Sequence, residues 1–469
     1  MQPFSPIFGG GATESLIHPL VFGLMLLAGV LFLVLGRKYV VVPFVLAIIL
    51  IPVGQQFYVG GVHLFVSRIL ILAAFFRVLA SRVPNQRSRF AGGWNSIDTA
   101  FAGYVLISAI ATLMRYPSGM ALINQMGFLW DYLLGYLVMR SLLQDERDTV
   151  LAIKWLAAIM VLLAVGMVAE QMRMGNFFGL LGGVASVPEI RNGKIRSQAV
   201  FQHALTAGAF AATSIPLLLA LWIRGKARFL AALGIIGAMV MTVATQTSTS
   251  LLTLAAAIVG VLIWPLRARM KVVTAGLAAF IVGLHLVMKA PVWFLIARID
   301  LTGSSSSYHR AELVDQFVNN FGKWWLIGTK EAATWGWDMW DAQNMFVSVG
   351  EAGGLAALIC YILVISRSFA RLGVAGKRCS SSQRRWLLWL LGAALFANVI
   401  AFFGVNYFDQ LRMAWFMLIS MICACTAPLV RRAPAPARVP SSFVMDGVAE
   451  SQAVFDPPEA VVAVANVRG

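Results

Sequence analysis

Long apolar runs constrain this chain more than any other feature of its sequence. The mean hydropathy is +0.80 over 469 residues and only 12% of the residues are charged, values outside the usual range of soluble globular domains. A helix needs roughly 20 apolar residues to cross a bilayer, and many of the runs approach this length. The sequence therefore predicts an all-α polytopic membrane protein.

The apolar runs predict about 12–13 transmembrane helices with a long outer-face loop that contains short amphipathic helices. We expect the helices at about 16–35, 40–57, 62–80, 97–114, 126–143, 149–170, 203–223, 229–247, 249–265, 272–289, 344–366, 386–405 and 411–430. The apolar runs also predict the lipid bilayer as a partner.

Lys and Arg clusters in alternate loops predict the orientation of the chain, because cytoplasmic loops of membrane proteins are enriched in basic residues. The formal charge of +17 then reflects topology, and no nucleic-acid partner is expected. The basic clusters include Arg37/Lys38, Arg82/Arg87/Arg89, Arg140/Arg147, Arg224/Lys226/Arg228, Arg267/Arg269/Lys271, the stretch 367–385 and Arg431/Arg432.

The opposite, outer face carries two long loops, residues 171–202 and 290–343, and shorter loops at 54–61, 115–125 and 406–410. Long connections in compact proteins are often functional. We therefore divide the chain into residues 1–202, with the N-terminal helices and the first long loop; residues 203–432, with the second long loop; and residues 433–469, a Pro- and Ala-rich tail predicted to be disordered and cytoplasmic.

The first long loop ends in four groups that can carry positive charge: Arg191, Lys194, Arg196 and His203. Each of them can simply be solvated. Arg196 and His203 lie seven residues apart, which places both on one helix face if the helix begins that early.

The second long loop contains GSSSSYHR, residues 303–310, and then a tryptophan-rich stretch. Leu313, Phe317 and Phe321 recur every four residues, which predicts an amphipathic helix on the membrane surface, with Ser304 to Ser307 as N-cap candidates. The tryptophans fit an interfacial belt or stacking on sugar rings. The candidate binding residues here are Arg298, His309, Arg310, Trp325, Asp341, Asn344 and Glu351. The last three could equally be capping or helix-pairing residues.

Arg68 is a further candidate, because it interrupts an apolar run near the outer half of its helix. A buried arginine in a membrane needs a partner. Asp131 or a lipid phosphate would serve.

Three stretches of the sequence resemble the superfamily of bacterial O-antigen polymerases and O-antigen ligases. RSQAVFQH at 196–203 is similar to an Arg, aromatic, His-Pro run, and GSSSSYHRAELVDQF at 303–317 to a Gly/Ser-rich segment that precedes an Arg and a helix. WWLIGTKEAATWGWDMWDAQN at 324–344 is similar to a Trp-x-Leu-x-Gly element followed by Asp-x-x-Asn. Two positions depart from the pattern: Ala204 replaces the usual Pro, and Gln343 stands where a His often precedes the Asn.

The resemblance implies that residues 203–432 form an O-antigen-ligase-like catalytic region in the bacterial inner membrane, with its active site facing the periplasm or exterior. It implies metal-independent glycosyl transfer, without a cofactor, from an undecaprenyl-pyrophosphate-linked glycan to an acceptor glycan. A flippase and a chain-length regulator are candidate partners. The implied roles are pyrophosphate binding by Arg196 and Arg310, with Lys194 and Arg298 as lesser candidates, and proton acceptance by His203 or, second, His309.

Four functions remain open on the sequence alone. A polymerase of exopolysaccharide or O-antigen is favoured over a ligase, because the His before Asn344 is missing. A transporter of lipid-linked sugar would carry intramembrane charges spread along several helices or repeats. A structural subunit of a secretion apparatus would tolerate the loss of Arg196 or Arg310.

Overall fold

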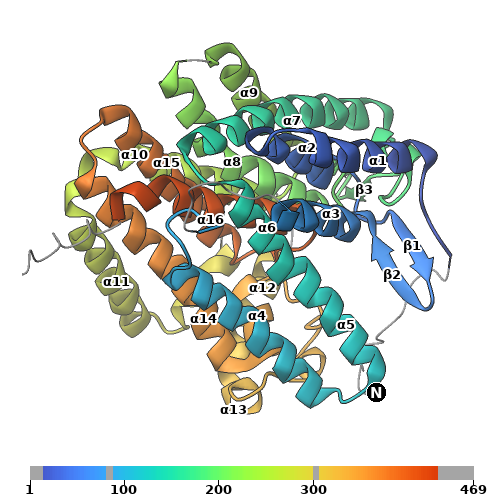
Figure 1. Ribbon diagram of the computed structural model, residues 1–469. Coiled ribbons are helices and arrows are strands. Elements are labelled where there is room, and N and C mark those ends of the chain that lie inside the picture. Colours follow the sequence, from blue (N-terminus) through green and yellow to red (C-terminus); the bar gives the residue numbers. More distant parts are fainter. Residues whose placement is uncertain (1–13, 81–87, 226, 299–305, 431–469) are drawn as a thin grey trace, which may run out of the picture. The chain divides into compact units, whose positions relative to one another are not determined.

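Helices form nearly all the regular structure of this chain in the computed structural model, which describes residues 14–80, 88–225, 227–298 and 306–430 (Figure 1). The predicted tail, Arg82, Arg87, Lys226, Arg431, Arg432 and Ser304 lie outside the described residues. The N-terminal part contains α1 (Pro19–Val34), α2 (Arg37–Leu50), β1 (Gln56–Val59), β2 (Val62–Phe65), α3 (Val66–Ala80), α4 (Ser96–Arg115), α5 (Gly119–Leu129), the π-helix η1 (Trp130–Leu134), α6 (Gly135–Leu142), α7 (Glu146–Arg173), η2 (Phe177–Leu181), β3 (Glu189–Arg191) and β4 (Lys194–Arg196).

The remainder of the described chain is helical throughout. It contains α8 (Ala204–Arg224), α9 (Arg228–Ala244), α10 (Ser248–Leu262), η3 (Trp264–Arg269), α11 (Met270–Val287), η4 (Val292–Arg298), α12 (Ser306–Asn319), α13 (Phe321–Trp324), η5 (Ala332–Thr334), α14 (Met345–Arg378), α15 (Ser382–Ala401) and α16 (Asp409–Val430).

Seven helical segments among the described residues are long and apolar enough to cross a membrane. They are Ser96–Arg115, Glu146–Arg173, Ala204–Arg224, Trp264–Val287, Met345–Arg378, Ser382–Ala401 and Asp409–Val430. A helix satisfies its backbone N–H and C=O groups internally, which is what an apolar solvent demands. The chain is an all-α polytopic membrane protein, as its hydropathy predicts.

Two of the predicted helices are shorter than expected at the end of the bundle that carries residues 51–65. The expected helices at 40–57 and 62–80 instead become α2, an antiparallel hairpin of β1 and β2, and α3. Gly60 and Gly61 at the hairpin turn have positive φ angles of 58° and 83°, a conformation that glycine adopts without steric cost. The apolar runs therefore include the strands as well as the helices.

Small residues allow the long helices to approach one another closely. A Cβ on Gly234 of α9 would lie 2.9 Å from the Cβ of Ala157 on α7, and one on Gly237 would lie 2.9 Å from the carbonyl oxygen of Met160. Such small residues are typical of helix interfaces inside membranes, where close van der Waals packing replaces the hydrophobic effect. In Figure 1, α4 and α14 likewise lie side by side.

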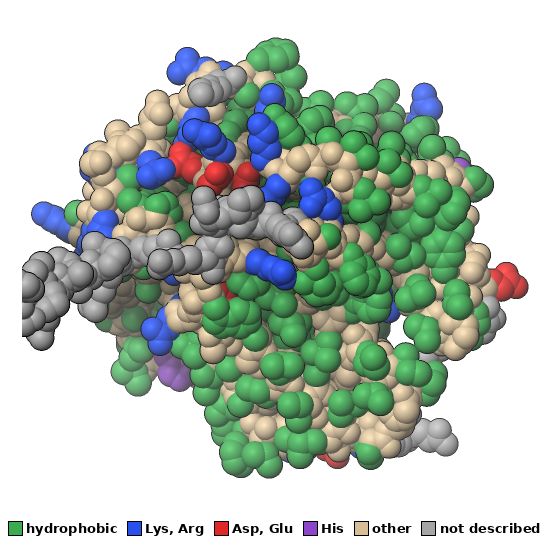
Figure 2. Space-filling view, viewed as in Figure 1, with side chains coloured by type: hydrophobic (Ala, Val, Ile, Leu, Met, Phe, Trp, Pro, Cys, Tyr) green, Lys and Arg blue, Asp and Glu red, His purple; other side chains and the backbone are tan. Residues whose placement is uncertain are grey.

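One end of the bundle gathers the basic loops, and we call it the basic end. Glu146 at the start of α7 pairs with Arg224 at the end of α8 and with Arg384 at the start of α15. Figure 2 shows most Lys and Arg side chains of the visible face gathered beside a group of acidic side chains, while the rest of that face is largely hydrophobic. This distribution matches basic loops at one end of an apolar bundle.

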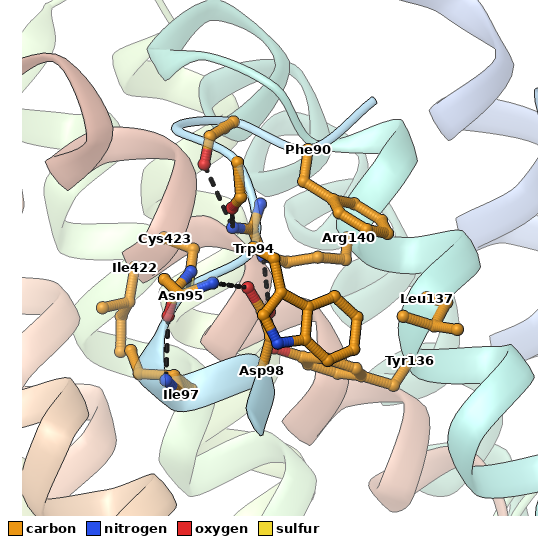
Figure 3. Close-up of polar contacts among 12 residues, drawn as sticks. Phe90, Trp94, Asn95, Ile97, Asp98, Tyr136, Leu137, Arg140, Ile422 and Cys423 are labelled. Atoms are coloured by element: carbon orange, nitrogen blue, oxygen red, sulfur yellow. Dashed lines mark hydrogen bonds and ion pairs between the residues drawn. The ribbon is translucent and has the colours of Figure 1, made fainter. Parts of the chain in front are cut away.

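A buried ion pair fixes the basic end of α4 and α6 (Figure 3). Arg140 Nε lies 3.1 Å from Asp98 Oδ1, and the two side chains are 0% and 1% exposed. Asp98 also accepts a hydrogen bond from the Tyr136 hydroxyl and completes a capping box with Asn95 at the start of α4. Arg140 further donates to the carbonyl of Ala91. The pair ties the segment before α4 to α6.

The other end of the bundle, which we call the loop end, carries the β-hairpins and the loops expected on the outer face. Gln410 at the start of α16 donates to the carbonyls of Ile51, after α2, and Val200, before α8. The backbone N–H of Met345, at the start of α14, donates to the carbonyl of Phe402. Segments far apart in the sequence therefore meet at this end.

Candidate functional site

Arg68 and Asp131 meet at the loop end of the bundle, as the sequence predicts. Arg68 Nε and Nη2 donate to the two carboxylate oxygens of Asp131, at 3.1 and 2.9 Å, and Nη1 donates to the carbonyl of His63. Asp131 lies in the π-helix between α5 and α6, a local distortion that is frequent at functional sites. The partner of the buried arginine is a carboxylate of this chain.

Arg412, one turn inside α16, extends this cluster and is not among the site residues predicted from the sequence. Its Nη2 lies 3.9 Å from Asp131 Oδ2, and its side chain is 15% exposed. Its guanidinium carbon lies 4.7 Å from the centroid of the Tyr132 ring, a cation–π distance. The signal for it was present, since a charged residue at the start of an apolar run is a functional candidate by default.

Asp409 precedes Arg412 by three residues and has a backbone φ angle of 51°. Asp adopts this left-handed region more readily than most residues, though at some energetic cost. Among the described residues, Asp409 Oδ2 is buried without a hydrogen-bond partner. The neighbouring Tyr407 is held by a hydrogen bond to Asn398, and burial raises the pKa of its phenol well above the usual value, so it stays protonated.

His203 does not share a helix face with Arg196, because the helix does not begin early enough to include both residues. His203 is the N-cap residue of α8, while Arg196 ends strand β4. The His203 ring contacts Phe408 edge-on, with centroids 5.6 Å apart. The helix begins at Ala204, close to the expected residue 203, and residues 189–196 before it form a β-hairpin.

Arg196 is engaged within that hairpin. Its Nη1 lies 2.9 Å from both carboxylate oxygens of Glu189, the residue opposite it in the register of β3 and β4. Lys194 on the same strand is exposed. An ion pair with an exposed glutamate leaves Arg196 less positive toward a phosphate than the sequence suggests.

Arg310 and His309 lie on α12, which packs against η4 and α14. The Arg310 side chain is buried. Both ring nitrogens of His309 are buried without a hydrogen-bond partner in the part of the chain that the structure describes. An unsatisfied imidazole in a buried position is costly, which favours a functional role for it.

The apolar face of α12 packs against protein rather than lying on a membrane surface, which corrects the prediction. Leu313 and Phe317 belong to the hydrophobic core, whereas Phe321 is exposed and begins α13. Trp324 is buried too, stacked on Phe317 with ring centroids 3.9 Å apart, so it is not part of an interfacial belt. Trp325 is 46% exposed.

Helix α14 is interrupted at Gly354, whose φ of 72° and ψ of −171° are not helical. Arg115, at the end of α4, donates to the carbonyls of Glu351 and Ala352 just before the break and to that of Thr329. The carbonyls of Glu351 and Ala352 lose their helical partners at the break, and the buried guanidinium of Arg115 donates to them instead. Interrupted helices inside membranes occur where the chain lines a cavity or is buried in protein.

The three predicted residues at or near the start of α14 have different surroundings in the structure. Asn344 is buried and caps the helix, since its side chain accepts from the backbone N–H groups of Phe346 and Val347. Of the roles considered for Asn344, helix capping is therefore the one that the structure shows. Glu351 Oε1 is buried without a hydrogen-bond partner among the described residues. Asp341 accepts a hydrogen bond from Gln343.

The structure brings some of the predicted site residues together and leaves others apart. Arg68 and Asp131 form one cluster with Arg412, and His203 contacts Phe408, the residue before Asp409. Arg196 and Arg310 belong to separate elements, and their sharing of one pyrophosphate stays a prediction. Arg298 is exposed at the end of η4.

The fold and the cluster define a class: an all-α membrane protein with buried charged side chains at the loop end of its bundle. Within the described ranges, no three His, Cys, Asp or Glu side chains are grouped to hold a metal ion. Neither family models nor curated proteins match this chain.

Proposed function

We propose that this chain is a glycosyltransferase of the O-antigen polymerase and ligase superfamily, and specifically a polysaccharide polymerase. It transfers a glycan from undecaprenyl pyrophosphate to a hydroxyl of an acceptor glycan, on the outer face of the bacterial inner membrane. The product is an exopolysaccharide or an O-antigen. The proposal includes about 12–13 membrane crossings, with shorter helices such as α1, α9 and α10 among them.

The observation that carries the proposal is the set of arginine side chains at the loop end of an otherwise apolar bundle. Arg68 and Arg412 are largely enclosed, and Arg310 is buried. A guanidinium keeps its charge and forms paired hydrogen bonds to phosphate oxygens. The positive-inside rule places the basic end in the cytoplasm, so these arginines face the compartment where lipid-linked units are joined.

The chemistry of such a transfer needs fixed positive charge more than any other group. As the acceptor oxygen attacks the anomeric carbon, the leaving pyrophosphate gains charge, and preorganised cations in a poorly hydrated site stabilise it by several kcal/mol. A base must also accept the proton of the attacking hydroxyl. His203 and His309 are the histidine candidates, since an imidazole changes charge near neutral pH.

A transporter of the same lipid-linked sugar is the second candidate, because the interrupted helix α14 is a device of secondary transporters. In those proteins the free carbonyls of the break coordinate an ion. Here Arg115 donates hydrogen bonds to the carbonyls of Glu351 and Ala352. Because its guanidinium already lies against these carbonyls, they are not free to coordinate a coupling ion. This contact favours the enzyme.

The test is the size distribution of undecaprenyl-linked glycan in cells that lack the protein, complemented with wild type, Arg310→Ala or Arg173→Ala. Arg173 is exposed at the loop end of α7 and serves as the matched control. A polymerase predicts single repeat units in the null and Arg310→Ala strains, and normal chains with Arg173→Ala. Long lipid-linked chains that never reach a final acceptor would indicate a ligase instead. Units trapped on the cytoplasmic side would indicate a transporter.

A further inference from the structure

The guanidinium of Arg412 forms a hydrogen bond with the Tyr132 side chain, but not all of its five N–H donors have a partner in the part of the chain that the structure describes. Its nearest carboxylate oxygen, on Asp131, is 3.9 Å away, beyond hydrogen-bonding distance. Among the described residues its Nε is buried without a hydrogen-bond partner. Asp131 is already bound through both oxygens by Arg68. The Nε–H of Arg412 therefore lacks an acceptor among the described residues, and the carboxylate nearest to Arg412 is shared with Arg68.

Asp409, at the same end of α16, has a carboxylate oxygen that lacks a hydrogen-bond donor within the described ranges. Its Oδ2 is buried without a hydrogen-bond partner, and the ion pairs of the described residues do not include it. Asp409 and Arg412 lie three residues apart at the first turn of the helix, where their side chains are neighbours. No ion pair of the described residues joins them within 4.0 Å, so an anion beside Arg412 and a hydroxyl group beside Asp409 would satisfy both side chains.

We propose that Arg412 binds the diphosphate of the lipid carrier and that Asp409 accepts the proton of the attacking sugar hydroxyl. This inference rests on the proposed function and assigns the two groups of the reaction to one turn of α16. The acceptor oxygen forms a bond to the anomeric carbon, and the bond from that carbon to the diphosphate oxygen breaks. The electron pair leaves with the diphosphate, beside Arg412, and the hydroxyl proton passes to the Asp409 carboxylate.

Arg412 is more available to an added diphosphate than Arg196 is. The two arginines are about equally enclosed, with 13% of the Arg196 side chain and 15% of the Arg412 side chain exposed. Arg196 lies 2.9 Å from both carboxylate oxygens of Glu189, so its charge is largely neutralised, whereas the carboxylate nearest to Arg412 is 3.9 Å away. Electrostatic stabilisation of a leaving group is stronger where water is excluded.

Diphosphate binding is measured first, with the full chain in nanodiscs and farnesyl diphosphate as the probe. Farnesol, which lacks the diphosphate, is the ligand control. Arg412→Met should weaken binding about 10- to 100-fold, because it removes charge-assisted hydrogen bonds. Arg412→Lys should weaken it less, since it keeps the charge but not the planar fork. Arg173→Met, at an exposed position of the same end, should bind as the wild type does.

Asp409→Asn separates proton acceptance from binding. Asn tolerates the left-handed backbone of this position, so the variant should fold, and elution as a single species in size-exclusion chromatography checks this. Removing a negative charge near Arg412 should leave farnesyl diphosphate binding unchanged or tighter. Polymer formation in complemented cells should nevertheless be lost. A purely structural role of Asp409 does not produce this separation.

The outcomes distinguish this inference from the proposed function. If cells make polymer through this protein but Arg412→Met and Arg412→Lys bind the diphosphate as tightly as wild type, the inference is wrong and the function stands. If Arg412 binds the diphosphate but the null strain still polymerises, the function is wrong. Wild type that does not bind farnesyl diphosphate, or polymer made by Asp409→Asn, overturns the corresponding half of the inference.

Discussion

Replacing Asp98 with alanine should destabilise the protein strongly, because it strands a buried arginine. The Asp98 carboxylate accepts from Arg140 Nε, from the Tyr136 hydroxyl and from the backbone N–H of Asn95. Both charged side chains are almost completely buried. Removing one member of a buried ion pair costs about 3–5 kcal/mol, most of it from the charge left without a partner.

A double substitution tests the origin of this cost. In Asp98→Ala/Arg140→Met the stranded charge is gone, so we expect at least half of the lost free energy of unfolding to return. Glu189→Ala provides the matched control, because it removes the partner of Arg196 in an ion pair whose carboxylate is 51% exposed. A pair of this kind contributes about 0–1 kcal/mol.

The assay is reversible unfolding of the purified chain in mixed micelles as the fraction of dodecyl sulfate rises. The free energies of unfolding of wild type, Asp98→Ala, Glu189→Ala and Asp98→Ala/Arg140→Met are compared at one temperature. A loss for Asp98→Ala no larger than that for Glu189→Ala would refute the reasoning. So would a double variant less stable than Asp98→Ala, because that result would mean that packing around the pair dominates over charge.

Three further substitutions test the loop end. Gly354→Ala should unfold or strongly destabilise the chain, because a Cβ there lies 2.6 Å from the carbonyl oxygen of Leu326 and the φ angle is positive; a wild-type melting temperature would contradict this. Asn344→Ala should cost about 0.5–2 kcal/mol through the lost cap while glycan transfer persists, and loss of transfer in a stable variant would instead give Asn344 a role in the site. Arg68→Met should remove both hydrogen bonds to Asp131, leave it only Arg412 at 3.9 Å and so lower the melting temperature, and Arg68→Met/Asp131→Asn should recover part of that loss; an equal loss in both variants would exclude an electrostatic origin.

Part of the candidate site follows from the sequence because a charge inside an apolar run has few alternatives. Arg68 interrupts such a run and needs a partner, and Asp131 was named as one. Asn344 was named with capping as its alternative, and capping is the role that the structure gives it. Both predictions rest on local chemistry that any fold of this chain must satisfy.

Other parts of the site depend on contacts that no local pattern encodes. Arg196 and His203 would share a helix face only in a helix that begins at Arg196, and in the structure Arg196 instead belongs to a β-hairpin, where it pairs with Glu189. The tryptophans were expected in an interfacial belt or stacked on sugar rings, yet Trp324 stacks on Phe317 inside the protein. An amphipathic pattern shows which face of a helix is apolar, but not whether lipid or protein covers it.

The sequence by itself determined that this chain is a helical membrane protein and where most of its helices lie, because apolar length and basic loops act residue by residue. Only the tertiary structure decided which charges meet. Asp131, Arg68 and Arg412 come from η1, α3 and α16, segments hundreds of residues apart along the chain at their furthest. Their proximity results from helix packing, and so does the lack of an acceptor for the Nε–H of Arg412 among the described residues. Packing depends on side-chain shapes summed over many helices, which the hydropathy pattern does not contain.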